Sequence, residues 1–384
     1  MEARQIPVTE STAAANPPPH VLMAMELSNK TWLVRFGLLG RTGTRDVRVP
    51  ARNRKMLLDS IAAARQRLRV PADSPVTACY EAGRDGFWLS RFLEEHGVRC
   101  LIIESASIEV NRRRRRAKSD GIDVAMLFDK LGSYLGGDRR VFHVVTVPTV
   151  EAEDARRPDR ERDMLVGQRT SEINRIRSWL CLEGLELPED RSLRRALEGV
   201  IVPLRMREAL DRAVQRVEYI SAQIQDLEHA RRERLKVGVL QGHASSLMIV
   251  GLMGLCGIGE QGACRLTNEL FGWRPYRNRR DAGSLVGLTP TPWSSGDMNR
   301  ELGISKAGNP RLRGLLVELS WQWLRYQPRS KLSLWYQARF GGAGTQQRKK
   351  GIVALSRRLL VDLWRYAVSG GMPEGARLKA LVVL

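Results

Sequence analysis

The order of apolar runs between Val21 and Glu104 restricts the fold of this chain more than any other feature. Three short runs follow one another across tight turns, at Val21–Leu27, Thr31–Leu38 and Arg45–Val49. Such runs are typical of an antiparallel β-meander. The next four alternate between helical spacing and buried strands, in the order Asn53–Leu68, Val76–Tyr80, Gly86–His96 and Val98–Glu104.

Three antiparallel strands followed by helix, strand, helix and strand predict an α/β domain that begins like a ribonuclease-H-like core. With 384 residues, the chain is long enough for further domains. We expect a disordered tail at 1–19, the α/β domain at 20–160, long helices or a coiled coil at 161–240, and a mostly α C-terminal domain at 241–384. The charged stretch 151–163 is either a linker or the solvated start of a long helix.

The helical region carries an apolar seam, formed by Leu204, Ala209, Ala213, Val217, Ile220, Ile224 and Leu227. Apolar residues at intervals of three to five suit a helical hairpin or a coiled coil. We expect this seam to pack against a partner helix in a homo-oligomer, a dimer or a tetramer. An ordinary helix bundle is the alternative.

Charge indicates the partner. The chain has 63 Lys and Arg against 42 Asp and Glu, a formal net charge of +21. This excess predicts a polyanionic ligand, and nucleic acid leads because no amphipathic anchor or lipidation signal is evident. The N-terminus lacks an apolar signal region, and the longest apolar run, Leu247–Gly259, is too short to span a bilayer. We therefore expect a soluble protein with no membrane partner.

Cysteine usage indicates the compartment. The five cysteines are odd in number and form no CxxC pair. They favour a reducing cytoplasm over a disulfide framework or a zinc site.

Four acidic residues are placed like a metal site. Glu26 lies in the first strand, Glu81 follows the strand Val76–Tyr80, and Asp120 and Asp123 would share one face of a helix beginning near Ser119. Like charges gathered in one place resist ionising together unless a cation is present, and Mg²⁺ ions would resolve the conflict. Each acid could instead be a loop residue or a helix cap.

The C-terminal part offers a candidate nucleophile and candidate phosphate contacts. Ser295, beside Ser294, lies in a turn-rich segment that could present its hydroxyl, although a plain turn serine is the alternative. Gly257 and Gly259 resemble a helix-hairpin-helix turn that could approach a phosphate, or a glycine-rich packing turn. The remaining candidates for nucleic-acid contact are basic: Arg112, Arg113, Arg114, Arg115, Arg116, Lys118, Arg300, Lys306, Arg311 and Arg313.

Two unlinked motif sets in the same order resemble a known family. They are Tyr80-Glu81-Ala82-Gly83 with Lys118–Asp123, and Gly287-Leu288-Thr289-Pro290 with Ser295-Gly296 and Ile304–Arg313. The chain resembles the DEDD transposases of the insertion-sequence-110 type, which are bridge-RNA-guided serine recombinases. Glu26 departs from the family pattern, which usually has Asp at the first acid.

The resemblance implies a specific activity. The N-terminal domain would be RuvC-like and would bind Mg²⁺ through Glu26, Glu81, Asp120 and Asp123. Ser295 would attack DNA and form a covalent phosphoserine link. A non-coding RNA would pair with donor and target DNA and so carry the sequence specificity. The protein would be cytoplasmic and associated with the nucleoid when acting. The alternatives are a RuvC-like Holliday-junction nuclease that uses water, and a non-catalytic nucleic-acid-binding protein.

Overall fold

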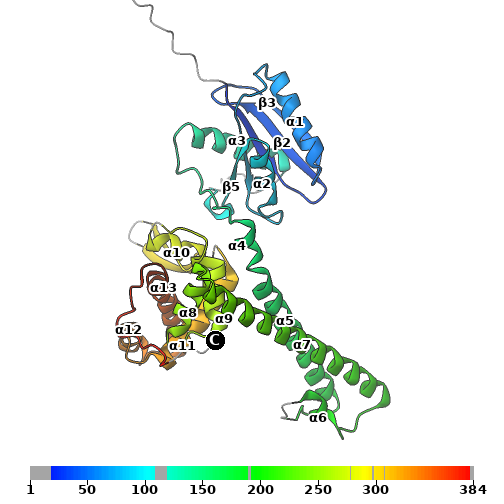
Figure 1. The fold of residues 1–384 in the computed structure, drawn as a ribbon, viewed down its shortest axis with the longest axis vertical. Helices are drawn as coiled ribbons and strands as arrows, with labels where there is room; N and C mark the ends of the chain where they lie inside the picture. Colours follow the sequence, from blue (N-terminus) through cyan, green and yellow to red (C-terminus); the bar gives the residue numbers. More distant parts are fainter. Residues whose placement is uncertain are drawn as a thin grey trace, which may run out of the picture. The chain divides into compact units, whose positions relative to one another are not determined.

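The computed structural model describes residues 19–108, 119–188, 192–276, 278–295, 298–306 and 308–380. The chain divides into two compact units, Met1–Val147 and Pro148–Leu384 (Figure 1). Between residues 291 and 302 the description covers the backbone alone.

The first unit is built on a five-stranded sheet of order β3-β2-β1-β4-β5. β1 pairs antiparallel with β2, which pairs antiparallel with β3, whereas β4 is parallel to both β1 and β5. The predicted meander and the two later strands are confirmed, each boundary within one residue of expectation. The strands are β1 (Val21–Glu26), β2 (Thr31–Leu38), β3 (Thr44–Pro50), β4 (Val76–Glu81) and β5 (Val98–Ile103).

Helices cover both faces of this sheet. Successive strand residues point to opposite sides, so each face has its own set of apolar side chains. The odd-numbered residues of β1 pack with α1 (Arg54–Arg67) and α2 (Trp88–Glu95). On the other face, Leu22 and Ala24 pack with α3 (Asp120–Leu135). A single turn of 3₁₀ helix, η1 (Ser105–Ser107), follows β5.

In the second unit, the long helices α5 (Arg157–Leu182) and α7 (Leu204–Leu240) lie side by side, with α6 (Leu193–Leu197) between them in the chain (Figure 1). The charged stretch 151–163 is largely helical, in α4 (Val150–Asp154) and the start of α5, so of the two interpretations the helical one holds. Proline is tolerated at Pro158 because the first turn of a helix needs no amide donor there.

The middle of the predicted seam is covered from within the same chain. Ala213 and Val217 are buried together with Leu210 and Val214, whereas Leu204 is 71% exposed. The other buried members of the cluster come from α5 and α6: Ile176, Leu180 and Leu197. The structure therefore pairs this part of the seam as an intrachain hairpin.

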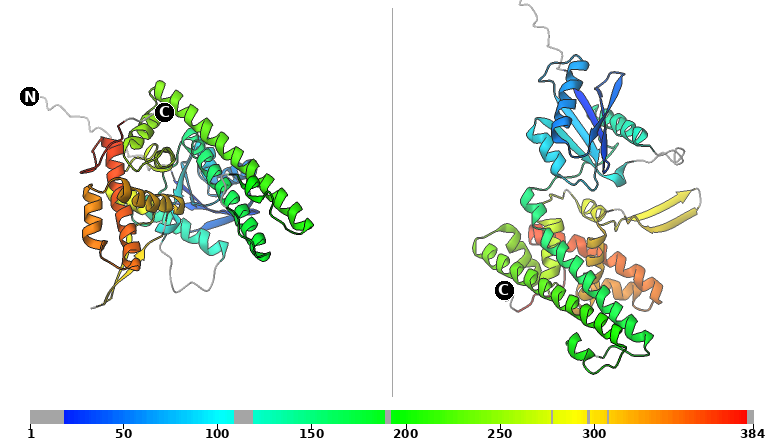
Figure 2. Two further views of the ribbon diagram at one scale, coloured as in Figure 1. Left: turned by 90° about the horizontal axis from the view of Figure 1, so that it is seen from below. Right: turned by 90° about the vertical axis from the view of Figure 1, so that its right-hand side faces the viewer.

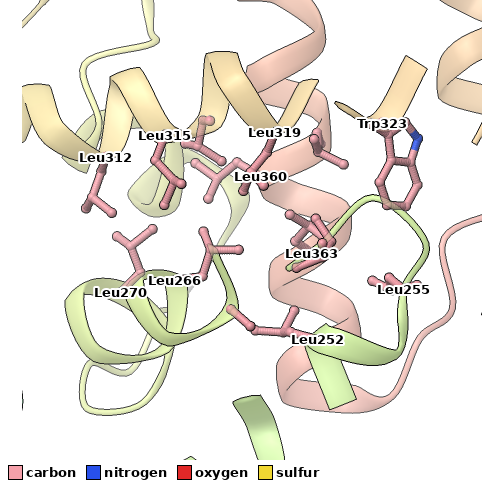
Figure 3. Packing of buried hydrophobic residues seen from close by; sticks show 14 of the residues in the cluster. Leu252, Leu255, Leu266, Leu270, Leu312, Leu315, Leu319, Trp323, Leu360 and Leu363 are labelled. Atoms are coloured by element: carbon pink, nitrogen blue, oxygen red, sulfur yellow. The ribbon is translucent and has the colours of Figure 1, made fainter. Parts of the chain in front are cut away.

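The rest of the second unit is a helical body with a separate two-stranded ribbon. A leucine-rich core joins the helices, with Leu252, Leu266, Leu319, Trp323 and Leu363 converging between them (Figure 3). The elements of this part of the chain are α8 (Ala244–Gly254), α9 (Glu260–Leu266), the π-helical η3 (Thr267–Phe271), α10 (Arg279–Leu285), the ribbon strands β6 (Pro290–Ser295) and β7 (Met298–Ile304), α11 (Pro310–Tyr326), α12 (Lys331–Phe340) and α13 (Thr345–Ser369).

Within the described residues no single helix is long and apolar enough to cross a membrane; α7 and α8, bent by 110° at their junction, meet the length and composition test only as a pair.

Candidate active site

Glu26 and Glu81 end two neighbouring parallel strands. The register pairs Met25 with Tyr80, so the glutamates that follow them lie next to each other. Both stand at the carboxyl ends of β1 and β4, at an edge of the sheet that we call the acidic edge. By strand alternation, both belong to the face of Leu22 and Ala24, which α3 covers. Glu26 is half-buried and Glu81 is exposed. The sheet thus brings together two of the four predicted acids.

Asp120 and Asp123 occupy the first turn of α3. The side chain of Ser119 caps this helix by accepting from the amide of Ile122, as the sequence indicated. Asp120 and Asp123 lie four residues before Val124 and Leu127, which are buried against the sheet. The helical repeat therefore places both aspartates on the same stripe, one turn beyond its apolar part.

Two contacts fix the direction of α3. A Cβ on Gly132 would lie 3.7 Å from Leu22, at the start of β1, and the Leu127 carbonyl lies 3.8 Å from the Cys79 sulfur, at the level of Ala24. Four helical residues rise about 6 Å, and two strand residues advance about 6.6 Å. Asp123 therefore lies at the level of Glu26, at the same edge as the glutamates.

A cavity of about 250 Å³ opens at this edge. Glu26, Tyr80 and Glu81 line it together with the loop that follows β4. That loop contributes Asp85, an acid not anticipated from the sequence, whose side chain is only 4% exposed. Its position between Gly83 and Gly86, in the short segment between a predicted strand and a predicted helix, was the available signal.

The donor chemistry of this edge fits a hard cation, because Mg²⁺ prefers carboxylate oxygens. Within the described ranges, however, no three His, Cys, Asp or Glu side chains are placed closely enough to hold a metal ion. The fold brings the acids to one edge of the sheet but does not set their side chains as ligands.

Ser295 is the last residue of β6, where it pairs with Met298 of β7. The expected turn is thus largely a strand, and Pro290 and Pro292 are tolerated because a two-stranded ribbon leaves each strand with one unpaired edge. Figure 2 shows this ribbon, in yellow, extending away from the helices of the second unit. Ser295 and Arg300 are both placed by backbone on it; their side chains lie outside the description.

The ribbon is fastened at its base. The amide of Ser305 donates to Thr289 at 2.8 Å, and that of Lys306 donates to Gly287 at 3.1 Å. Arg313 donates through one nitrogen to the carbonyls of Val286 and Lys306, each at 3.2 Å. Arg313 therefore positions the ribbon, a role that its predicted phosphate contact did not anticipate. Arg311 and Lys306 are exposed.

Gly257 serves close packing between helices. Its φ is +89°, and a Cβ there would lie 3.2 Å from the Gln322 carbonyl of α11. Gly259 is the N-cap residue of the short helix α9, and a Cβ there would meet nothing within 4 Å. The surroundings of Gly257 favour the packing-turn interpretation. Arg112–Arg116 and Lys118 lie outside the described residues.

Comparisons with known proteins converge on one family. Residues 251–334 match the model of the "Transposase IS116/IS110/IS902 family". The chain is 37% identical over 375 residues to "Putative transposase y4rJ" of Sinorhizobium fredii, covering 94% of each chain. It is 29% identical over 268 residues to the transposase for insertion sequence element IS1328 of Yersinia enterocolitica, covering 68% of this chain and 75% of the relative. It is also 29% identical over 225 residues to the transposase for IS1111A of Coxiella burnetii, covering 56% and 59%.

Proposed function

The chain belongs to the IS116/IS110/IS902 family of insertion-sequence transposases, and we propose that it cuts and rejoins DNA through Ser295, assisted by the acidic edge of its first unit. The observation that carries the proposal is the arrangement of acids. Glu26 and Glu81 end adjacent parallel strands, and the first turn of α3 brings Asp120 and Asp123 to the same edge.

A ribonuclease-H-like, RuvC-like core is the fold that this arrangement supports. The strand order β3-β2-β1-β4-β5, with β1 antiparallel to β2 and parallel to β4, agrees with it. Glu26, Glu81, Asp120 and Asp123 would hold Mg²⁺, which would supply positive charge for a phosphoryl transfer. The extra methylene of Glu26 allows its carboxylate to reach further into the cavity than an aspartate could.

Ser295 would act as the nucleophile. Its Oγ bonds to the scissile phosphorus and loses its proton, while the bond from phosphorus to the leaving deoxyribose oxygen breaks and that oxygen is protonated. Attack by another strand's hydroxyl reverses these steps and releases the serine. Each step breaks one phosphate ester bond and forms another, so rejoining needs no external energy source. Arg313 would contribute by holding the base of the ribbon.

The net charge supports a large nucleic-acid load. A charge of +21 suits donor DNA, target DNA and a non-coding guide RNA together. In this proposal, base pairing with the RNA selects the sites, and the protein binds the backbones. The exposed end of the seam at Leu204 would serve self-association into a dimer or tetramer.

Trapping tests the serine. Labelled DNA carrying the element's ends is incubated with the wild-type protein, Ser295→Ala or the matched control Ser294→Ala, and is resolved on a denaturing gel. We expect covalent protein–DNA adducts with the wild type and the control, and none with Ser295→Ala. Wild-type adduct levels in Ser295→Ala would overturn the assignment. Cleavage without any adduct would instead identify a nuclease that uses water.

Substitution of the acids tests the metal assignment. Asp120→Ala and Glu81→Gln should each abolish adduct formation, and chelation of divalent cations should do the same to the wild type. Ser119→Ala is the matched control, because it removes only the cap of α3 and costs about 1 kcal/mol of stability. Full activity in Asp120→Ala, or in chelator, would refute the metal role and leave the acids to structure.

A further inference from the structure

A long acid-free stretch in the C-terminal part plays no role in the proposed chemistry. Between Glu318 and Asp362 the sequence has no Asp or Glu. The same stretch carries only positive charges: Arg325, Arg329, Lys331, Arg339, Arg348, Lys349, Lys350, Arg357 and Arg358. Much of it lies beyond residue 334, where the match to the family model ends.

After the end of α11, this stretch forms α12 and most of α13, and these two helices lie antiparallel. Near one end, a Cβ on Gly351 would meet the ring of Phe340 at 2.6 Å. Further along, the guanidinium of Arg358 lies 4.0 Å from the centre of the Trp335 ring. The later residue of α12, Phe340, contacts the earlier residue of α13, and the earlier residue, Trp335, contacts the later one. The C-terminus of α12 therefore lies beside the N-terminal half of α13.

Charge is distributed unequally along this helix pair. At one end, Lys331 pairs with Glu374 at 2.5 Å and Arg365 lies 3.9 Å from Asp362. Asp362 is half-buried, and burial raises its pKa, which Arg365 opposes. Cations at this end, which we call the paired end, therefore have carboxylates beside them.

At the opposite end, the described residues provide no such ion pairs. Arg339, Arg348, Lys349 and Lys350 are all exposed, and in the described part of the chain none of them forms an ion pair. We call these four residues the basic end. Arg348 also donates to the Gly341 carbonyl at 2.7 Å, which ties the start of α13 to the end of α12. No side chain caps α13 at Gly344, so the positive end of the helix dipole adds to the same field.

A lipid surface is a poor match for this region. The apolar face of α13, including Leu355, Leu359 and Leu363, is buried in the core and has nothing to insert into a membrane. A set of exposed Arg and Lys side chains that form no ion pair with the described residues suits a regular row of phosphates. Duplex DNA offers such a row and is the substrate class on which transposases act.

We propose that the basic end of α12 and α13 binds the backbone of duplex DNA, in the same unit that carries Ser295. The contacts go to phosphates and read no sequence. The surface holds the duplex while another part of the protein selects the site. This inference rests on the proposed action on DNA, but it depends on neither Ser295 nor the acids as catalytic groups.

A charge-matched comparison tests it. The full-length protein binds a fluorescein-labelled DNA duplex of mixed sequence across a salt series, as Lys349→Gln/Lys350→Gln or as the control Lys331→Gln/Arg365→Gln. Each variant removes two cations, one from the basic end and the other from the paired end. The slope of log affinity against log salt should become shallower by about 0.9 for each phosphate that the variant no longer neutralises, and only in the basic-end variant.

Three outcomes would overturn the proposal. An unchanged slope in the basic-end variant would exclude contact, and equal changes in both variants would indicate net charge alone. A selective loss of binding to a structured RNA hairpin of matched length would assign the surface to RNA. Ser295→Ala should keep the wild-type slope while losing adducts, so failure of the proposed chemistry remains distinguishable from failure of this surface. Unfolding midpoints within error of the wild type confirm folding of both variants.

Discussion

Arg52 pairs with the buried carboxylate of Asp85 at the acidic edge of the first unit. Nη2 of Arg52 lies 3.1 Å from Oδ1 of Asp85, whose side chain is 4% exposed. Arg52 holds this position with a φ of +66°, a backbone conformation uncommon for a side-chain-bearing residue. Because Asp85 lines the same cavity as Glu26 and Glu81, this pair fixes a carboxylate beside them.

Removing the cation should leave a buried charge without its partner. We predict that Arg52→Gln lowers the free energy of unfolding by about 1 kcal/mol. This loss is smaller than for a fully buried ion pair, because the Arg52 side chain is half exposed and solvent screens the interaction. Arg52→Gly relieves the backbone strain but also removes the pair, so it should lie between Arg52→Gln and the wild type. Chemical denaturation measures all three. A null effect of Arg52→Gln in an Asp85→Asn background would confirm the coupling.

A second pair of variants concerns the base of the ribbon. Gly308 has a φ of +102°, and a Cβ there would lie 2.7 Å from the carbonyl carbon of Leu285, at the end of α10. Gly308→Ala should therefore cost about 3 kcal/mol, from strain and overpacking together, and reduce adduct formation by displacing the ribbon.

Gly40→Ala is its control. Gly40 has a φ of +72° but a Cβ there meets nothing within 4 Å, so only about 1 kcal/mol of strain is expected. Thermal unfolding measures both variants. An equal decrease in the unfolding midpoint of Gly40→Ala and Gly308→Ala would contradict the packing argument for Gly308.

The second unit contains a nearly buried charge network. Arg231 of α7 lies 2.7 Å from Glu260 and 3.4 Å from Asp159, and the two side chains Arg231 and Asp159 are 14% and 6% exposed. Asn268 donates to the other oxygen of Asp159 at 3.3 Å. Arg231→Met should destabilise the protein by about 3 kcal/mol, because it removes the ion-pair partner of the buried Asp159 and leaves Glu260 with only the more distant Arg232, at 3.8 Å.

The surface pair Arg157–Asp154 provides the comparison for this network. Its side chains are 71% and 74% exposed, so Arg157→Met should leave the unfolding midpoint unchanged. Adding Asp159→Asn and Glu260→Gln to Arg231→Met should recover part of the loss. An unchanged unfolding midpoint in Arg231→Met would mean that the network contributes nothing to stability.

Thiol reactivity should report on burial. Cys181 is exposed, whereas Cys79, Cys100 and Cys264 are buried. Burial raises the pKa of Cys100 and of Cys264 to about 12 each, which removes the reactive thiolate at neutral pH. A thiol reagent followed by mass spectrometry should modify Cys181 rapidly in the native protein and the three buried thiols only after unfolding. Rapid native modification of Cys100 would contradict the packing of β5.

Local patterns account for the parts that the sequence predicted well. The strands between Val21 and Glu81 follow from alternation and turn residues, and the start of α3 follows from its capping residue, Ser119. These signals act within a few residues, so they survive without knowledge of the partner element. Glu26 and Glu81 could be placed at one edge because parallel strands align their carboxyl ends.

Long-range contacts account for what the sequence did not show. Asp85 becomes a buried acid only because Arg52, from the loop between β3 and α1, reaches it. Arg313 becomes a support for the ribbon because α11 carries it beside the Val286 and Lys306 carbonyls. In both cases a charged residue that looked like a surface group found its partner through packing.

The sequence alone determined the order of strands and helices from Val21 to Ile103, the positive charge and the four candidate acids, because these follow from residue type and spacing. Tertiary structure decided which charges are neutralised. Lys331 and Lys350 are alike in the sequence, but folding brings Glu374 to the first and, among the described residues, no acid to the second. An ion pair depends on distances of a few ångströms between residues far apart in the chain, and only the packing of α12 and α13 sets those distances.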